Sequence, residues 1–351
     1  MKLSVVDQSP VSSGMTPAQA LRNTIDLARH CDRLGYHRYW IAEHHGMEVI
    51  ATSVPEIMIA MVAEATTHIR VGSGAVLLPH YAPLKVAETF RMLHALFPGR
   101  IDLGLGRAPG AEALEAFALK RTRDKPSFDV DDFPEQLMEL LAFLRGGFEA
   151  DHPFSQIRVT PESPGEPEVW LLGSSAWSAS AAAQLSLPYA YAHFINPTGT
   201  RLCVDRYSKL FIPSERLAQP HAAVAVGVVC AGTDEEADGL ASTYRAMGRR
   251  LRLGLRGPVP TPEVALQELA EGPTPPAPEG EWPRLVVGAP ATVKAELETI
   301  AAALGANEIM AVTITHDHAA RVRSYELLAE AFDLTPFSSR EKEGPARSAG
   351  G

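Results

Sequence analysis

Apolar runs with the length of buried strands alternate along this chain with stretches whose apolar positions recur at helical spacing. The eight predicted strands lie at 3–7, about 39–43, 69–78, 100–107, 169–173, 189–194, 222–229 and 309–315. Each is followed by a helical pattern. Eight strand–helix units are the count of a (β/α)8 TIM barrel, an α/β fold in which parallel strands are enclosed by helices.

Capping signals mark several of the intervening helices. Thr16-Pro17-Ala18-Gln19 is a capping box with proline at the first helical position, and it predicts a helix that runs to Leu34. We expect further helices at about 55–65, 83–97, 133–144, after the serines at 174–178, from Asn196-Pro197 to Leu210, after Thr233, at 292–304 and up to Phe332.

Two stretches interrupt the alternation. Residues 146–167 follow the fourth strand–helix unit as an insertion, with a hairpin expected around 157–159, and residues 254–284, rich in proline and glycine, follow the seventh as a mobile excursion. We expect 1–335 to form one domain and 336–351 to be a disordered tail. A doubly wound sheet is the main alternative, but no Gly-rich dinucleotide turn follows the first strand.

The predicted helix at 55–65 is apolar all the way round, although a helix that coats a barrel needs only one apolar face. Its other face should therefore be covered. Together with Phe90, Met92, Leu93 and Leu96 of the next helix, it should pack against a second copy of the chain, since a two-fold contact buries such excess apolar surface most simply.

Composition narrows the class of protein. The 351 residues are 46% apolar and carry a net charge of −10, which disfavours nucleic acid and anionic membranes as partners. Cys31, Cys203 and Cys230 are far apart, so neither a disulfide framework nor a zinc knuckle fits. No run of about 18 apolar residues and no signal-peptide pattern is present. We therefore expect a cytoplasmic protein that does not enter a membrane.

The second strand ends in Glu43-His44-His45, which places titratable groups where barrels collect their chemistry, at the C-terminal ends of the strands. Adjacent strand residues face opposite sides, so one histidine should face the barrel mouth. A pair of hydrogen-bonded structural histidines is the alternative. His316 and His318 are spaced to face one way and could serve a metal-dependent hydrolase, but no further ligand set completes such a site.

Four local patterns agree in order and spacing with one known family: Trp40-Ile41-Ala42-Glu43-His44-His45, Val71-Gly72-Ser73-Gly74-Ala75-Val76-Leu77-Leu78-Pro79, Gly99-Arg100 through Gly106-Arg107, and Gly305-Ala306-Asn307-Glu308 with Arg323-Ser324-Tyr325. Over about residues 1–335 the sequence resembles the bacterial luciferase-like, flavin-dependent monooxygenases. The resemblance implies a (β/α)8 barrel, a homodimer formed by a helical bundle, and reduced FMN over the C-terminal strand ends. In some relatives the deazaflavin F420 takes the place of FMN.

The implied activity is oxygenation of a small organic substrate by O2 through a flavin peroxide, with a separate reductase supplying reduced flavin. His44 matches the active-site histidine, and an imidazole that titrates near neutrality suits proton handling there. His193 would line the substrate side, with a strand-end structural histidine as the alternative. The light-emitting relatives have cysteine where this chain has Gly106, so luminescence is not implied.

The resemblance also assigns the cofactor site. Ser73, Gly74 and Ala75 would lie beneath the flavin ring, with a non-prolyl cis peptide at Gly74–Ala75; an ordinary trans strand of small residues is the alternative.

The phosphate would bind at Gly173, Ser174, Ser175 and Ser178, opposite Arg107. Hydroxyls and free N–H groups converge there with a positive helix dipole, which suits an anion. A serine N-cap beside a surface arginine is the alternative. The luciferase has an acidic residue at the position of Ser174.

The sequence does not specify the substrate, the choice between FMN and F420, or the reductase. A flavin-binding protein without turnover stays open, because some relatives have lost catalysis. The colour of protein loaded with FMN and a metal analysis would separate these classes.

Overall fold

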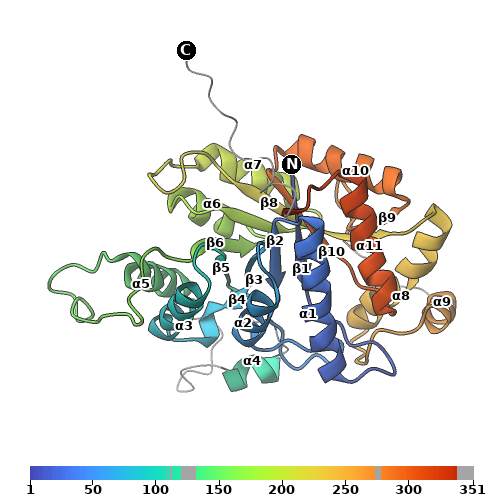
Figure 1. Ribbon diagram of the computed structural model, residues 1–351, viewed down its shortest axis with the longest axis horizontal. Coiled ribbons are helices and arrows are strands. Elements are labelled where there is room, and N and C mark those ends of the chain that lie inside the picture. The colour runs from blue at the N-terminus through green and yellow to red at the C-terminus, as the bar shows by residue number, and fades with distance from the viewer. Residues whose placement is uncertain (109, 111–112, 120–131, 273–277, 338–351) are drawn as a thin grey trace, which may run out of the picture.

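The computed structural model describes residues 1–351 except 109, 111–112, 120–131, 273–277 and 338–351. Its centre is a closed parallel barrel (Figure 1). The barrel strands, in chain order, are β1 (Lys2–Asp7), β2 (Arg38–Ile41), β3 (Arg70–Ser73), β5 (Ile101–Gly106), β6 (Glu168–Gly173), β7 (Tyr189–Ala192), β8 (Ala222–Cys230) and β10 (Glu308–Val312). Pairing of β10 with both β1 and β8 closes the ring. The predicted (β/α)8 barrel is confirmed.

Helices surround the barrel (Figure 1). They are α1 (Pro17–Leu34), α2 (Pro55–Ala65), α3 (Pro83–Leu96), α4 (Ala113–Leu119), α5 (Phe133–Arg145), α6 (Ala176–Gln184), α7 (Thr200–Leu210), α8 (Asp234–Arg252), α9 (Pro262–Ala270), α10 (Pro290–Leu304) and α11 (His318–Ala331). The predicted capping box of α1 is present, with reciprocal bonds between Thr16 and Gln19. Gly35 ends α1 in the left-handed conformation, as a C-terminal glycine commonly does.

Several predicted details are wrong. Residues 148–167 contain no strand, so the expected hairpin is absent; four prolines in this stretch, which lack the N–H that a strand pair needs, disfavour one. Helix α7 begins at Thr200 rather than at Asn196. The carbonyl and side-chain oxygens of Asn196 instead accept hydrogen bonds from Tyr191 and Thr198, which makes a turn before the helix.

The predicted excursion at 254–284 contains α9, which the sequence analysis missed although Thr261-Pro262 is a capping signal. It leads into a short strand, β9 (Leu285–Gly288), that pairs with the end of β8 outside the ring. The predicted strand at 69–78 is two short strands, β3 and β4 (Val76–Leu77), joined by Gly74 and Ala75. The expected tail falls almost entirely outside the described residues.

Two indoles occupy the centre of the barrel. Trp40 of β2 and Trp170 of β6 are fully buried, and their rings meet edge to face with centroids 5.1 Å apart. Small and branched side chains from the other strands complete this inner cluster: Val6, Ala190, Ala223, Ala225, Met310 and Val312. The barrel is therefore packed through its middle, and space remains only toward its ends among the described residues.

Below the indoles, toward the N-terminal strand ends, lies a buried ionic network. The Arg38 guanidinium, 3% exposed, donates to Asp102 (2.8 Å), Glu168 (3.2 Å) and Glu308 (3.3 Å). Arg70 donates to the other oxygen of Asp102 (2.9 Å). Burial alone would raise the pKa of the Asp102 carboxyl, but the two guanidiniums outweigh it and hold that pKa below its usual value. The network joins strands β2, β3, β5, β6 and β10.

Helices α2 and α3 differ in part from the prediction. Phe90 and Leu93 do not face outward, because both pack in the core of their own chain. Exposed apolar side chains do remain on these helices: Ile57 (63% exposed), Met61 (51%), Met92 (56%) and Leu96 (64%). No helix of the described chain is long and apolar enough to cross a membrane.

We expect Asp102→Leu to lower the free energy of unfolding by about 3–5 kcal/mol, because it leaves Arg38 and Arg70 buried without their shared carboxylate. Urea unfolding near neutral pH measures the change. Glu281→Leu removes the partner of Arg201 in an exposed ion pair and should have a much smaller effect. Equal losses in the two variants would contradict a structural role for the network.

Candidate functional site

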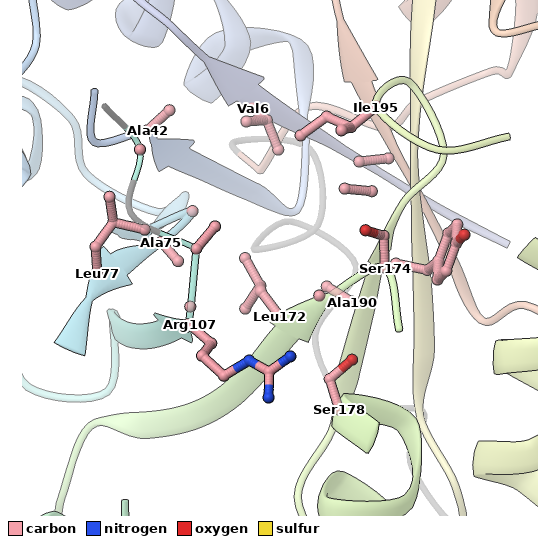
Figure 2. A pocket seen from close by; sticks show the side chains of 18 of the residues that line it. Val6, Ala42, Ala75, Leu77, Arg107, Leu172, Ser174, Ser178, Ala190 and Ile195 are labelled. Carbon is pink, nitrogen blue, oxygen red and sulfur yellow. The ribbon is translucent and has the colours of Figure 1, made fainter. Parts of the chain in front are cut away.

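A cavity of about 310 Å³ opens at the C-terminal ends of the barrel strands. Its wall is mainly apolar, as is common for sites that hold small molecules and cofactors. The described residues that line it include Val6, Gln8, Trp40, Ala42, Glu43, His44, Gly74, Ala75, Leu77, Gly106, Arg107, Phe133, Leu171, Leu172, Gly173, Ser174, Ser175, Trp177, Ser178, Ala190, Tyr191, Phe194, Ile195, Ala225 and Met310. Figure 2 shows part of this wall.

One end of the cavity is polar. Ser175 is the N-cap of α6, and its hydroxyl accepts the Ser178 backbone N–H at 3.3 Å. The Ser178 hydroxyl donates to the Ser175 carbonyl oxygen at 2.9 Å. A Cβ on Gly173 would lie 2.6 Å from Ser178 Oγ, so glycine is needed for the strand to approach the helix this closely. The turn from β6 into α6 is thus compact, with its hydroxyls and first N–H groups at the cavity.

Arg107 lies across this end from α6. It follows β5 directly, and its guanidinium carbon is 5.3 Å from the Trp177 ring centroid. Figure 2 shows the guanidinium pointing from the β5 side toward Ser178. A guanidinium, two hydroxyls and a helix N-terminus at one place can bind a phosphate, so these residues fit the phosphate end of a flavin nucleotide. The predicted residues Arg107, Gly173, Ser174, Ser175 and Ser178 all line the cavity.

The middle of the cavity has a flat backbone wall. The Gly74–Ala75 peptide is cis, and both residues line the cavity. A Cβ on Gly74 would lie 3.1 Å from Trp40 Cβ, so the backbone sits directly against the indole. Ser73 does not line the cavity: it is fully buried, and its hydroxyl donates to the Gly104 carbonyl oxygen at 2.9 Å and accepts the Gly104 N–H at 3.0 Å. Ser73 therefore joins β3 to β5 behind the wall.

His44 and His45 lie in the loop after β2, because the strand ends at Ile41 rather than near residue 43. The alternation expected for a strand therefore does not apply to them. His44 nevertheless lines the cavity, whereas His45 Nε2 is 2.9 Å from Glu43 Oε1. The fully buried Glu43 carboxylate also accepts the Leu77 N–H (3.0 Å) and the Tyr81 hydroxyl (2.9 Å). Glu43 thus fixes the loop that carries His44.

The imidazole of His44 is neutral at pH 7. Burial, with a smaller effect from the neighbouring charge of His45, lowers its pKa from 6.5 to about 4. This differs from the expectation of a group that titrates near neutrality. A neutral ring can still accept or donate a hydrogen bond at the cavity wall, and a negative charge beside it would raise its pKa.

A family model described as luciferase-like monooxygenase matches residues 1–308. A luciferase-like monooxygenase of Escherichia coli K12 is 38% identical over 327 residues, which are 92% of this chain and 95% of that protein. The chain belongs to the luciferase-like monooxygenase family. The family and its monooxygenase neighbours make it an oxidoreductase.

Two further proteins are similar to the chain over most of its length. The N-acetyl-S-alkylcysteine monooxygenase of Bacillus subtilis is 35% identical over 340 residues, covering 94% of this chain and 98% of that protein. The crystal structure of apo-MsnO8 is 48% identical, covers 95% of this chain and 99% of its own, and superposes with a TM-score of 0.88.

More distant structures share the fold. They include the oxygenating constituent of 3,6-diketocamphane monooxygenase from Pseudomonas putida with FMN, at 22% identity, and an F420-dependent secondary alcohol dehydrogenase, at 15%. Each has a TM-score of 0.68. The first covers 94% of this chain and 97% of its own, and the second covers 95% of this chain and 99% of its own.

In this luciferase-like monooxygenase, the other predicted histidines lie away from the cavity. His193 is fully buried, with Nδ1 2.7 Å from Thr200 Oγ1 and Nε2 3.1 Å from the Pro283 carbonyl oxygen. Its neighbours Phe194 and Ile195 line the cavity instead. His193 thus connects the end of β7 to α7 and to the segment before β9, and its expected contact with substrate is not supported.

The histidines considered for a metal-dependent hydrolase have different partners. His316 Nε2 is 3.0 Å from the Ser13 hydroxyl, and His318 Nε2 is 2.9 Å from an Asp26 carboxylate oxygen. Within the described ranges, no three His, Cys, Asp or Glu side chains are grouped so that they could hold a metal ion. The hydrolase alternative therefore has no support from these two residues.

The sequence did not identify Gln8 as a cavity residue, and it indicated Glu43 only as one of the titratable groups at the end of the second strand. Gln8 directly follows β1 and is 7% exposed. Its position at a C-terminal strand end is the one signal that could have identified it. Glu43 lies within the family pattern, but the pattern does not reveal its hydrogen bonds. Two of its three partners, Leu77 and Tyr81, are distant in sequence and come close only in the folded chain.

We expect the stability of the protein to fall as the pH is lowered from 6.5 to about 4, partly through His44. The unfolded chain binds a proton at His44 more readily than the folded one does, so this contribution is complete above pH 6.5 and is lost below it. His44→Gln should reduce the slope of unfolding free energy against pH in this window, measured by urea unfolding. His37→Gln, at the other barrel end and with its pKa also lowered to about 4, is the matched comparison. If the slope were reduced in His37→Gln but unchanged in His44→Gln, the lowered pKa of His44 would be contradicted.

Proposed function

We propose that this protein uses reduced FMN and O2 to oxygenate a small organic substrate. One observation carries the proposal: Arg107 and the N-terminus of α6, groups that suit an anion, lie together at one end of a mainly apolar cavity that His44 also lines. The match to named monooxygenases over most of the chain supports oxygenation as the reaction class.

Each part of the cavity has a role in this proposal. Arg107, Ser175 and Ser178 bind the phosphate, and the flat Gly74–Ala75 wall supports the ring. Reduced flavin supplies the electrons that activate oxygen when it is bound. The surrounding apolar side chains exclude water, which strengthens the electrostatic interactions within the site. His44 holds or moves a proton at its ring nitrogens, because negative charge that develops beside it favours the imidazolium form.

We infer FMN rather than F420 because the relatives above 30% identity with a specific activity in their names are monooxygenases. The distant F420-dependent structure shares the fold alone. We also propose that a separate reductase supplies the reduced flavin. Titration of the protein with FMN and with F420, followed by flavin fluorescence, tests the choice; tighter binding of F420 would reverse it.

We expect Arg107→Ala to weaken FMN binding about tenfold to a hundredfold, since a hydrogen bond to a charged group contributes about 1.5–3 kcal/mol. Riboflavin, which lacks the phosphate, should bind weakly to the natural protein and respond little to the substitution. Fluorescence titration measures both affinities. Arg158→Ala, on an exposed side chain that does not line the cavity, is the control. Equal weakening of FMN and riboflavin would mean that Arg107 does not contact the phosphate.

We expect His44→Ala to keep FMN affinity within a few-fold and to lower oxygenation by about 10²–10⁴, the usual contribution of a positioned acid–base group. His45→Ala should lower it less, because its ring is bonded to Glu43 outside the cavity wall. Stopped-flow mixing of protein-bound reduced FMN with oxygen provides the measurement. A long-lived flavin peroxide would support the reaction class, and reoxidation without one in the natural protein would count against it.

We propose in addition that the protein is a homodimer through α2 and α3. Ile57 and Met61 of α2 and Met92 and Leu96 of α3 leave a set of apolar side chains exposed, which a two-fold contact would bury. Light scattering at micromolar concentration should give twice the chain mass. Ile57→Glu should shift the protein toward monomer, whereas Leu266→Glu, on exposed α9, should not. A monomeric natural protein would rule the dimer out.

A further inference from the structure

The cavity has a second end, across the barrel from the anion site. Strands β5 and β6, which carry the anion site, are neighbours in the ring, and β1 and β10 are neighbours on its opposite side. The wall there is formed by Val6, Gln8, Phe194, Ile195 and Met310. Figure 2 shows Val6 and Ile195 well apart from Arg107 and Ser178. A flavin phosphate held at Arg107 therefore leaves this far wall for another molecule.

Gln8 is a polar group of this far wall without a protein partner for its amide. The side chain is 7% exposed and lines the cavity. Its backbone carbonyl accepts the Thr52 hydroxyl at 3.5 Å, but its side-chain amide has no hydrogen bond to another residue of the described chain. The amide is not enclosed by protein atoms but reaches the cavity space, so a group that enters the cavity can pair with its N–H or its oxygen.

The backbone around Gln8 is held rigidly. Asp7 accepts the Ser9 N–H at 2.7 Å and is paired with Arg321 at 2.6 Å. The Ser9 hydroxyl is 2.6 Å from Thr24 Oγ1, and its carbonyl oxygen accepts the Ala51 N–H at 3.0 Å. The residues on both sides of Gln8 are thus bonded to the structure behind them. Such support keeps the amide at the cavity, as a specificity-determining group requires.

The charges around the cavity restrict what can bind there. Arg107 lies at the other end, and the Glu43 carboxylate already accepts three hydrogen bonds. His44 is neutral at pH 7 because burial lowers its pKa. The other described residues of the far wall are apolar, and the titratable groups nearest to Gln8 along the strand pairing are Glu43 and His44, in the loop after β2. An ionised group in this wall would lose its hydration without gaining a counter-charge.

We propose that Gln8 is a specificity-determining residue, and that the substrate is an uncharged, mainly apolar molecule with one hydrogen-bonding group that pairs with the Gln8 amide. The proposal rests on the proposed function, which assigns the other end of the cavity to the flavin phosphate. The amide offers both a donor and an acceptor, so a carbonyl, amide or hydroxyl group satisfies it.

Three probes of equal chain length test the preference for a neutral ligand: hexanamide, hexanoate and hexylamine, titrated by calorimetry near neutral pH into FMN-loaded and flavin-free protein. Hexanamide should bind at least about tenfold more tightly than either ion, in line with the cost of an unpaired buried charge. In FMN-loaded protein, hexanoate or hexylamine binding as tightly as hexanamide would overturn the proposal. In flavin-free protein the comparison is hexanamide with hexylamine, because hexanoate can also bind beside Arg107.

Two variants test the residue itself. Gln8→Met, which keeps the volume, should weaken hexanamide about threefold to tenfold, the value of a neutral hydrogen bond, and leave FMN affinity unchanged. Gln8→Glu should shift the preference toward hexylamine. Gln267→Met, the same substitution on an exposed position of α9, is the matched control and should not affect the probes. Unchanged probe affinities in both Gln8 variants would overturn the proposal.

The two proposals fail in different ways. Weak FMN binding by the natural protein would count against the proposed function, and the flavin-free titrations would still measure the Gln8 effect. Tight FMN binding with no Gln8 effect would count against this inference alone.

Discussion

The structure depends on the pairing of Arg38 with the carboxylates at the N-terminal end of the barrel. A guanidinium is strongly hydrated in water, and its burial is tolerated here because Asp102, Glu168 and Glu308 surround it. These partners come from strands that are distant in sequence. They can meet only if the sheet closes into a ring, so the network is specific to the barrel and would be left unpaired in an open sheet.

The two ends of the barrel have different chemistry because of this network. At the N-terminal end the charges neutralise one another and leave few unsatisfied groups. At the C-terminal end the strands lead into loops and into the N-terminus of α6, where N–H groups and hydroxyls are available to a ligand. The inner indole layer of Trp40 and Trp170 separates these regions. The cavity therefore has an apolar floor, and its polar groups are confined to the rim.

The sequence predicted the barrel well because its signal repeats eight times, and a misplaced boundary changes little. The polar turn at the start of α6 was predictable because serines after a strand and before a helix meet a known requirement of helix ends. The position of the His193 ring could not be read from the sequence, because β7 ends at Ala192 and the ring direction depends on local bonds to Thr200 and Pro283. The neutral state of His44 could not be predicted, because it depends on how deeply the loop is buried. Gln8 belongs to no motif, and only its position directly after the first strand could have indicated it.

Trp40 connects the ionic network at one end of the barrel to the cavity at the other. Its indole N–H donates to Asp102 at 2.9 Å, within the ionic network, while its ring forms part of the cavity floor. A change in the shape of the floor would therefore disturb the charge pairing that closes the barrel. Over evolutionary time, new substrates are more readily accommodated by substitutions in the rim loops than by substitutions at this indole. We expect the residues of the floor to vary little among relatives of this chain, and sequence differences to be concentrated in the segments that surround the floor.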